Sequence, residues 1–373
     1  MNESVYLDNN ATAPTRPEVI RAVESVMMSV GNPSSVHGHG RQAKKTLERV
    51  RADVASLCAV QPEAVTFTSG GTEANNIVLR GAGRRRIVMS AVEHPSVRDA
   101  CPDAEIVPVD RSGVIDLGAL EAMLKADDTP TLVSIMAANN ETGVIQPMSQ
   151  IATLAHRYDA LVHCDAVQAA GKIDIDAADM GVDFLVISSH KIGGTAGCGA
   201  IINVHDLPLA PLVRGGGQER KVRSGTENLV GIAGFGAAAA IVRAQGKAEM
   251  TRLGQMRDRL ERDIASRIKT VSVVGADAKR LANTSCLILP GVTSEIQVMA
   301  LDLEGISVSA GSACSSGKVS VSPVLDAMGY AEDEASATIR VSFGWANNET
   351  DVERFVDAFT ALYERARDRQ SAA

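Results

Sequence analysis

The stretch VDFLVISSHK, residues 182–191, decides the fold class of this 373-residue chain. Its apolar centre, residues 184–187, is typical of a strand that is buried on both faces, and such strands belong to parallel sheets. Two serines, a histidine and a lysine follow where the apolar run ends. Ligands of open parallel sheets bind beyond the carboxyl ends of the strands, so these four residues lie where a ligand is expected.

Seven segments in the first 203 residues read as strands of one sheet. Helical or turn-like segments separate them, and strands that alternate with helices predict a mostly parallel sheet with helices on both faces. The expected strands lie in AVTFTS (64–69), RRIVMSA (85–91), AEIVPV (104–109), TLVSIMAA (131–138), ALVHCDA (160–166), VDFLVISS (182–189) and GCGAIIN (197–203). Polar residues follow several of these strands, which again indicates a site at the carboxyl edge.

The sequence pattern changes after about residue 245. Residues 16–60 read as helical, with a second helix at roughly 37–58, and a long charged helix is expected at 247–268. The later β-rich runs TVSVV, TSCLILP and TIRVSF precede a final helix at 349–368. This part of the chain predicts a smaller α+β domain.

Composition restricts the class of partner. The chain is 45% hydrophobic and 22% charged with a net charge of −8, which argues against nucleic acid or an anionic membrane as the main partner.

The first residues, MNESVYLDNN, lack the basic and apolar regions of a signal peptide, and the apolar stretch at 229–242 is too short to span a bilayer. The six cysteines have no CxxC and no metal-ligand spacing, so we expect reduced thiols, a cytoplasmic location and no metal site.

Two runs match the pattern G-x-G-x-x-A, at residues 38–43 and 234–239. Neither follows a convincing strand, and neither has an acidic residue about twenty positions later in a second strand. We therefore do not expect a dinucleotide site.

Three features together predict a pyridoxal phosphate site. A lysine placed like Lys191 forms Schiff bases with carbonyl compounds when its pKa is lowered by burial, although it can also extend into solvent. Asp165, at the end of ALVHCDA, supplies a carboxylate of the kind that pairs with the pyridine nitrogen. TSGGTEANN, residues 68–76, has the strand, glycine turn and helix start of a phosphate site. Singly, these features also fit a cap or a tight turn.

The chain resembles the cysteine desulfurases of the NifS/IscS type, which are class V aminotransferase, fold-type I pyridoxal phosphate enzymes. The resemblance runs nearly end to end, through YLDNNATAP (6–14), GNPSSVHGHGRQA (31–43), TSGGTEANN, EHPSV (93–97), NNETGVIQP (139–147), HCDAVQAAGK (163–172), SSHK (188–191), GGGQERKVRSGTEN (215–228), SAGSACSS (309–316) and IRVSFG (339–344). It implies a large, mostly parallel mixed sheet flanked by helices in a cofactor-binding domain at 15–245. Residues 1–14 and 246–373 would form the small α+β domain.

The resemblance also implies roles for individual residues. Lys191 is expected to bond covalently to pyridoxal 5′-phosphate, and His94 to stack on its ring and move protons. The remaining expected contacts are Asp165 to the pyridine nitrogen, Gln168 near the ring hydroxyl, Gly71, Thr72, Ser188 and His190 to the phosphate, Asn140 to cofactor and substrate, Arg340 to the substrate carboxylate, and Thr226 to the phosphate across a homodimer interface. Without the resemblance, Arg340 would also fit a structural salt bridge, and His94 a surface loop.

Cys314 is the expected sulfur-accepting thiol. The implied reaction converts L-cysteine to L-alanine, with the sulfur captured as a persulfide on Cys314 and passed to an Fe–S scaffold protein or another sulfur carrier. The thiolate form would attack, and a mobile loop of small residues such as SAGSACSS would let one thiol reach both cofactor and acceptor. Lys318 either lowers the pKa of Cys314 or lies in solvent.

One segment departs from the family pattern. Relatives commonly have Pro-Lys-Gly-x-Gly after the lysine, whereas this chain has GGTAGCGA, with Thr195 and Ala196 in place of the proline and lysine and with Cys198 close by. We expect the cofactor still to bind. Two other functions stay open: a selenocysteine lyase or other class V lyase or aminotransferase, and a catalytically silent scaffold.

Overall fold

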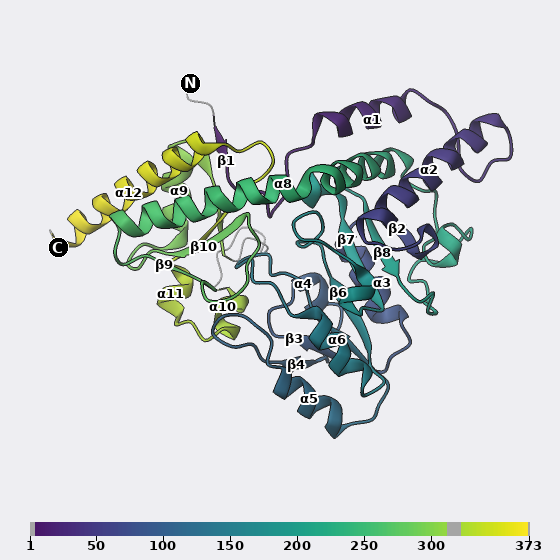
Figure 1. Cartoon of the computed structure of the whole chain (residues 1–373), viewed down its shortest axis with the longest axis horizontal. Coiled ribbons are helices and arrows are strands. Elements are labelled where there is room, and N and C mark those ends of the chain that lie inside the picture. The colour runs from purple at the N-terminus through teal and green to yellow at the C-terminus, as the bar shows by residue number, and fades with distance from the viewer. Residues whose placement is uncertain (1–3, 312–321, 372–373) are drawn as a thin grey trace.

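The computed structural model describes residues 4–311 and 322–371 (Figure 1). A seven-stranded sheet forms the larger part, in the order β2-β8-β7-β6-β5-β3-β4. From β7 to β4 the neighbouring strands are parallel, whereas β8 is antiparallel to β7 and to β2. The strands are β2 (Val65–Thr68), β3 (Arg86–Ser90), β4 (Glu105–Val107), β5 (Thr131–Ser134), β6 (Leu161–Asp165), β7 (Phe184–Ser188) and β8 (Gly199–Asn203). The predicted mostly parallel mixed sheet is confirmed.

Helices cover both faces of this sheet, as the alternation of strands and helices predicts. Each face has its own buried apolar cluster, one reached by Leu47 and Phe235 and the other by Ile77. The helices of this part are α1 (Pro17–Met27), α2 (Gly38–Leu57), α3 (Gly71–Gly81), α4 (Pro95–Arg98), α5 (Leu117–Ala126), α6 (Met148–His156) and α7 (Ala177–Met180). Three short 3-10 helices are η1 (Pro62–Ala64), η2 (Ser189–Ile192) and η3 (Glu219–Lys221).

The long helix α8 (Leu229–Arg267) runs beside both sheets (Figure 1). It contacts α1 and α2 near its start and α12 (Glu349–Ser371) further along. Its first half is long and apolar enough to cross a membrane by composition, but 56% of that apolar window is buried inside the protein. A Cβ atom at Gly234 would lie 2.4 Å from Cγ2 of Thr195, so the glycines there serve close helix packing. The predicted domain boundary at 245 falls within α8, and the division itself stays a prediction.

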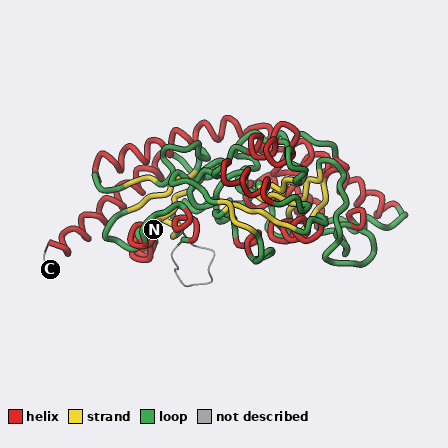
Figure 2. Tube along the Cα trace, turned by 90° about the horizontal axis from the view of Figure 1, so that it is seen from below, coloured by secondary structure: helices red, strands yellow, loops and turns green. Residues whose placement is uncertain are grey.

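The smaller part contains a four-stranded antiparallel sheet in the order β12-β13-β10-β9 and a parallel pair, β1 with β11. Its strands occupy a separate end of the elongated chain (Figure 2). The elements are β1 (Val5–Tyr6), β9 (Ser272–Val273), β10 (Thr284–Ile288), α9 (Ser294–Leu303), β11 (Ile306–Ser307), β12 (Ser309–Ala310), α10 (Pro323–Ala327), α11 (Glu332–Ser336) and β13 (Thr338–Ser342).

The N-terminal segment joins the two parts. The backbone N–H of Leu7 donates to Ser307 in the smaller part, at 2.9 Å, and the N–H of Ala13 donates to the carbonyl of His190 beyond β7, at 3.0 Å. The segment therefore crosses the gap between the carboxyl edge of the large sheet and β13. This crossing brings residues from both parts to one site.

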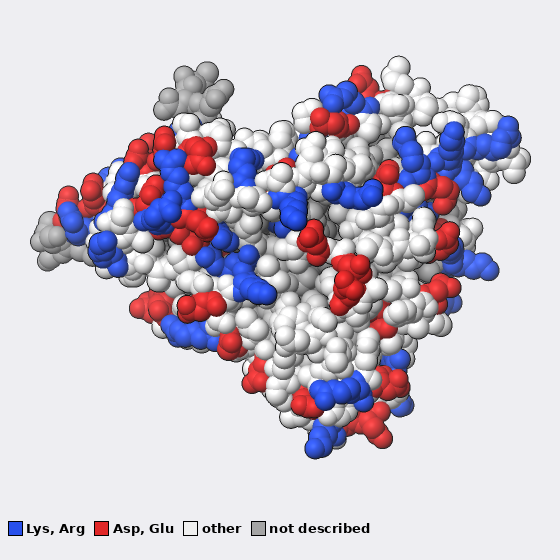
Figure 3. Space-filling view, in the orientation of Figure 1, with Lys and Arg blue, Asp and Glu red and all other residues white. Residues whose placement is uncertain are grey.

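The surface over α8 and α12 carries interspersed acidic and basic side chains (Figure 3). Arg259 pairs there with Glu349 at 2.7 Å and with Glu353 at 2.8 Å. This face differs from the single-sign basic patch that is typical of nucleic-acid binding.

Candidate active site

A cavity of about 310 Å³ lies at the carboxyl edge of the large sheet, where the N-terminal segment and β13 approach it. The predicted site residues that line it are Gly71, Thr72, His94, Asn140, Asp165, Gln168, Ser188, His190, Lys191 and Arg340. Thr226 is exposed and lies outside this lining. Cys314 and Lys318 fall in the range 312–321, outside the described residues.

Lys191 points its amine at the N-terminal segment instead of extending into solvent. It lies in η2, directly after the buried strand β7. Its Nζ donates to the carbonyl oxygen of Asn10 at 2.6 Å and to that of Ala11 at 2.8 Å. The amine is thus held at the cavity by two backbone acceptors.

Asp165 ends β6 and is 6% exposed. Its Oδ1 accepts from the backbone N–H of Val167 at 2.9 Å, and its Oδ2 accepts from Nδ2 of Asn75 at 2.8 Å. Two donors therefore fix the carboxylate at the wall of the cavity. A carboxylate held in this way suits pairing with a protonated ring nitrogen.

Another part of the lining suits a phosphate. Gly71 begins α3, so the first backbone N–H groups of that helix have no partner within the helix, and the hydroxyls of Thr72 and Ser188 lie beside them. A Cβ atom at Gly71 would lie 2.8 Å from Cγ2 of Val167, which explains the glycine. Burial and the charge of Lys191 lower the pKa of His190 to about 4, so this ring is neutral near pH 7.

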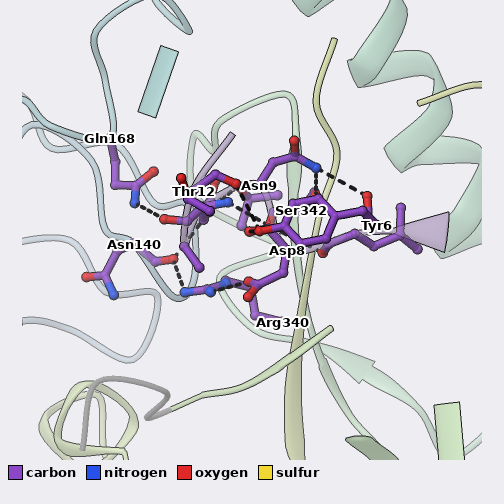
Figure 4. Close-up of polar contacts among 12 residues, drawn as sticks. Tyr6, Asp8, Asn9, Thr12, Asn140, Gln168, Arg340 and Ser342 are labelled. Carbon is purple, nitrogen blue, oxygen red and sulfur yellow. Dashed lines mark hydrogen bonds and ion pairs between the residues drawn. The ribbon is translucent and has the colours of Figure 1, made fainter. Parts of the chain in front are cut away.

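Gln168 is held by two residues that were not predicted from the sequence, Asn10 and Lys172. Nε2 of Gln168 donates to the carbonyl of Asn10 at 2.8 Å (Figure 4). Oε1 of Gln168 accepts from Nζ of Lys172 at 2.7 Å. Lys172 also donates to Oδ1 of Asn10 at 2.8 Å. Burial lowers the pKa of Lys172 well below its usual range, and the charges of Lys191 and Arg340 lower it further. The spacing of Lys172 four residues after Gln168 was the available sequence signal.

Arg340 lines the cavity and also makes a salt bridge, the other role that the sequence allowed for it. Its Nη2 donates to Oδ1 of Asp8 at 2.6 Å, and its Nη1 donates to the carbonyl of Asn140 at 3.0 Å (Figure 4). Its Nε is buried and has no hydrogen-bond partner among the described residues. A buried N–H without a partner is costly, so a ligand that accepts from it would be stabilised.

The five described cysteines do not supply a thiol to this cavity. None of them lines it, and burial raises the pKa of each: Cys58, Cys101, Cys164, Cys198 and Cys286. Cys198 in particular is 1% exposed, although the sequence suggested a place near the cofactor. In the same segment the Thr195 hydroxyl donates to the carbonyl of Gly231 at 2.7 Å and so anchors the turn to α8.

The donor set fits pyridoxal phosphate. An amine, a fixed carboxylate and a helix start with two hydroxyls surround one cavity. The Nε of Arg340, which has no partner within 4–311 and 322–371, remains for the carboxylate of an amino acid. The sequence family model for aminotransferase class-V matches residues 5–355 of the chain.

Curated relatives and solved structures agree with that match. The chain is 40% identical to a cysteine desulfurase of Cereibacter sphaeroides, over 98% of this chain and 97% of the relative. It is 36% identical to the cysteine desulfurase IscS of Dictyoglomus turgidum, over 98% and 96%. A NifS-like protein from Rickettsia africae superposes with a TM-score of 0.91 at 36% identity, covering 97% of this chain and 100% of that structure.

Proposed function

This chain belongs to the aminotransferase class-V family and is a cysteine desulfurase of it, and from that premise we propose how its cavity carries out the reaction. The enzyme converts L-cysteine to L-alanine and transfers the sulfur. The observation that carries the proposal is the convergence of Lys191, Asp165 and Arg340, from three separate segments, on one cavity.

Pyridoxal 5′-phosphate would be held at four points. Lys191 would bond to its aldehyde carbon, Asp165 would pair with its ring nitrogen, and the start of α3 with Ser188 would receive its phosphate. Gln168 would lie near its ring hydroxyl. When bound, the group provides a carbonyl for amine exchange and a ring that accepts the electron pair left on the α-carbon.

The substrate would be oriented by Arg340. A guanidinium with a free N–H binds a carboxylate with direction as well as charge, and Asn140 lies beside it. Lys191, once its amine is free, is placed to take the α-proton. His94, on the wall next to Ser96, is placed to hold a hydrogen bond to the reacting groups.

The sulfur would leave the substrate for a thiol of the chain. Attack of the Cys314 thiolate on the substrate sulfur gives L-alanine and a persulfide on Cys314, which then passes its outer sulfur to an acceptor. The five described cysteines are outside the cavity lining and have raised pKa values, which supports Cys314 as the acceptor thiol. An Fe–S scaffold protein or another sulfur carrier in the cytoplasm would receive the sulfur.

We also propose that the enzyme is a homodimer. Thr226 is exposed and outside the lining of its own cavity, so a phosphate contact from Thr226 would have to be made to a second subunit. The segment that carries it is anchored by Arg223, whose Nε donates to Glu73 in α3 at 3.0 Å.

The test is release of alanine from L-cysteine by the purified enzyme with pyridoxal phosphate and a reductant. We expect wild-type enzyme and Cys101→Ala to release alanine, and Lys191→Ala and Cys314→Ala to release none. Cys101 is the matched control because it is the described cysteine that is half-buried instead of buried. Equal alanine release by Cys314→Ala and wild type would remove Cys314 from the reaction.

A further inference from the structure

We propose that Asn75 and Ser96 are positioning residues that link Asp165 to His94 by hydrogen bonds and hold His94 with its proton on Nε2. The inference deepens the proposed function and rests on it, because Asp165 and His94 are taken as groups that face the cofactor. Asn75 and Ser96 both line the cavity, and neither is among the site residues predicted from the sequence.

Asn75 uses every polar atom of its side chain. It lies in α3 and is fully buried. Its Nδ2 donates to Oδ2 of Asp165 at 2.8 Å and to Oγ of Ser96 at 2.9 Å. Because a carboxylate oxygen accepts hydrogen bonds, the nitrogen of the amide and not its oxygen faces Asp165. Asp165 therefore sets the orientation of the amide.

The amide oxygen of Asn75 is paired as well. It lies 3.2 Å from Nε2 of His163, so that nitrogen carries the hydrogen. Nδ1 of His163 lies 2.8 Å from the Ser134 hydroxyl, which can donate to it. Burial lowers the pKa of His163 to about 4, so the ring is neutral near pH 7. A turned amide would place two acceptors, its own oxygen and Asp165, against each other.

Ser96 passes this orientation to His94. Its Oγ accepts from Asn75, which leaves the hydroxyl hydrogen to donate to Nδ1 of His94 at 2.9 Å. The backbone N–H of Ser96 donates to the same ring nitrogen at 3.1 Å. Because a backbone N–H can only donate, Nδ1 must carry a lone pair. A neutral His94 therefore has its hydrogen on Nε2.

The two hydrogen bonds from Ser96 also oppose the charged form of His94. A hydrogen on Nδ1 would point at two donors, the hydroxyl and the backbone N–H of Ser96. Burial lowers the pKa of His94, Asp165 and Asp99 raise it, and Lys191 lowers it. In the resting enzyme His94 then offers a hydrogen-bond donor through Nε2. The removal of the α-proton is left to Lys191.

The test is ¹⁵N NMR of the holoenzyme labelled in histidine, since the shifts of the two ring nitrogens report both tautomer and charge. The chain has seven histidines, and the His94 signals are assigned by their loss in His94→Gln. We expect a neutral His94 with its hydrogen on Nε2 in the wild type. Ser96→Ala removes one of two donors to Nδ1, so the tautomer stays and the titration midpoint rises by about 0.5–1 pH unit, the equivalent of one neutral hydrogen bond.

Asn75→Ala should raise the midpoint in the same direction, because the Ser96 hydroxyl is then free to turn away. Asn76→Ala is the matched control, since its amide donates to carbonyl oxygens of Thr72 and Ser96 and not to the Ser96 hydroxyl. We expect no change of midpoint in this control. If circular dichroism shows that Asn75→Ala is not folded, the titration midpoint of His94 in Ser96→Ala tests the inference by itself.

A hydrogen on Nδ1 of His94 in the wild type would overturn the inference. So would an unchanged midpoint in Ser96→Ala. The readout does not depend on turnover, so an enzyme that fails to release alanine would contradict the proposed function and leave this result standing.

Discussion

The guanidinium of Arg340 in β13 donates to the carboxylate of Asp8, at 2.6 Å, from the other end of the chain. The side chain of Arg340 is 3% exposed and that of Asp8 is 16% exposed. Arg340 lines the cavity, and the arginine expected to bind the substrate is thus already oriented by the carboxylate of Asp8 (Figure 4).

Asp8→Asn should therefore weaken binding of L-cysteine. The amide keeps the shape but loses the charge that orients Arg340, and we expect KM to rise about tenfold with a smaller change in kcat, the equivalent of one charge-assisted hydrogen bond. Steady-state kinetics of alanine release measure both constants. Asp258→Asn is the control, because Asp258 lies 2.6 Å from Arg257 but is 60% exposed. A KM that stays at the wild-type value in Asp8→Asn would show that the pair does not orient the arginine.

Lys172→Met should weaken the cofactor site, although Lys172 itself is not proposed to touch the cofactor. The substitution removes the donor to Oε1 of Gln168 and to Oδ1 of Asn10, so each of these side chains loses one of its hydrogen bonds. We expect the dissociation constant of pyridoxal phosphate to rise about tenfold, for the loss of one or two hydrogen bonds. Absorbance titration of the apoenzyme measures it, with the exposed Lys247→Met as control. Equal affinities in the two variants would refute the role of Lys172.

Glu141 should make stability depend on pH. It is buried, and burial raises its pKa to about 7 against the opposing effects of the Ser322 hydroxyl, Arg340 and Arg98. Because the folded state binds the proton more tightly than the unfolded chain, the stability that Glu141 contributes is complete below about pH 4.5 and is lost as the pH rises toward 7. For this shift the loss is at most about 3 kcal/mol.

Glu141→Gln should remove that dependence. We expect the thermal midpoint of Glu141→Gln, relative to that of the wild type, to rise between pH 5 and pH 8. The other titratable groups are common to both proteins, so their effects cancel in this difference. Ser322→Ala removes the hydroxyl donor that favours the ionised form of Glu141. The loss of stability with rising pH should therefore continue to higher pH in this variant than in the wild type. A difference that does not vary with pH would mean that Glu141 ionises normally.

The buried ion pair of Arg51 and Glu219 should be required for stability. Nη1 of Arg51 lies 2.8 Å from Oε2 of Glu219, and the two side chains are 7% and 2% exposed. Removing one partner leaves a buried charge, so Glu219→Gln should destabilise the protein by about 3 kcal/mol. Glu349→Gln breaks an exposed pair with Arg259 and should cost less than about 1 kcal/mol. Similar thermal midpoints for the two variants would contradict this account.

Much of the large sheet was predictable because buried parallel strands are short apolar runs with polar residues after them. β7, with Ser188 and Lys191 at its end, is the plainest example. The same reasoning predicted Asp165 at the end of β6 and Gly71 after β2. The extent of α8 was not predicted, since its first half is rich in glycine and alanine and its packing against Thr195 and α2 depends on tertiary contacts.

The supporting residues of the site were also missed, for a physical reason. Asn75 donates to Ser96, 21 residues later in the chain, and to Asp165, 90 residues later, and no spacing in the sequence reports such pairs. Asn10 shows the same limit, because its carbonyl oxygen receives both Lys191 and Gln168.

The central claim is that sulfur moves from L-cysteine to Cys314 through chemistry that requires Lys191. Mass spectrometry of the peptide that contains Cys314, after incubation of the holoenzyme with L-cysteine, tests this most directly. The account predicts a gain of one sulfur atom on that peptide in the wild type and none in Lys191→Ala. A sulfur gained on another cysteine instead, or an equal gain in Lys191→Ala, would contradict it.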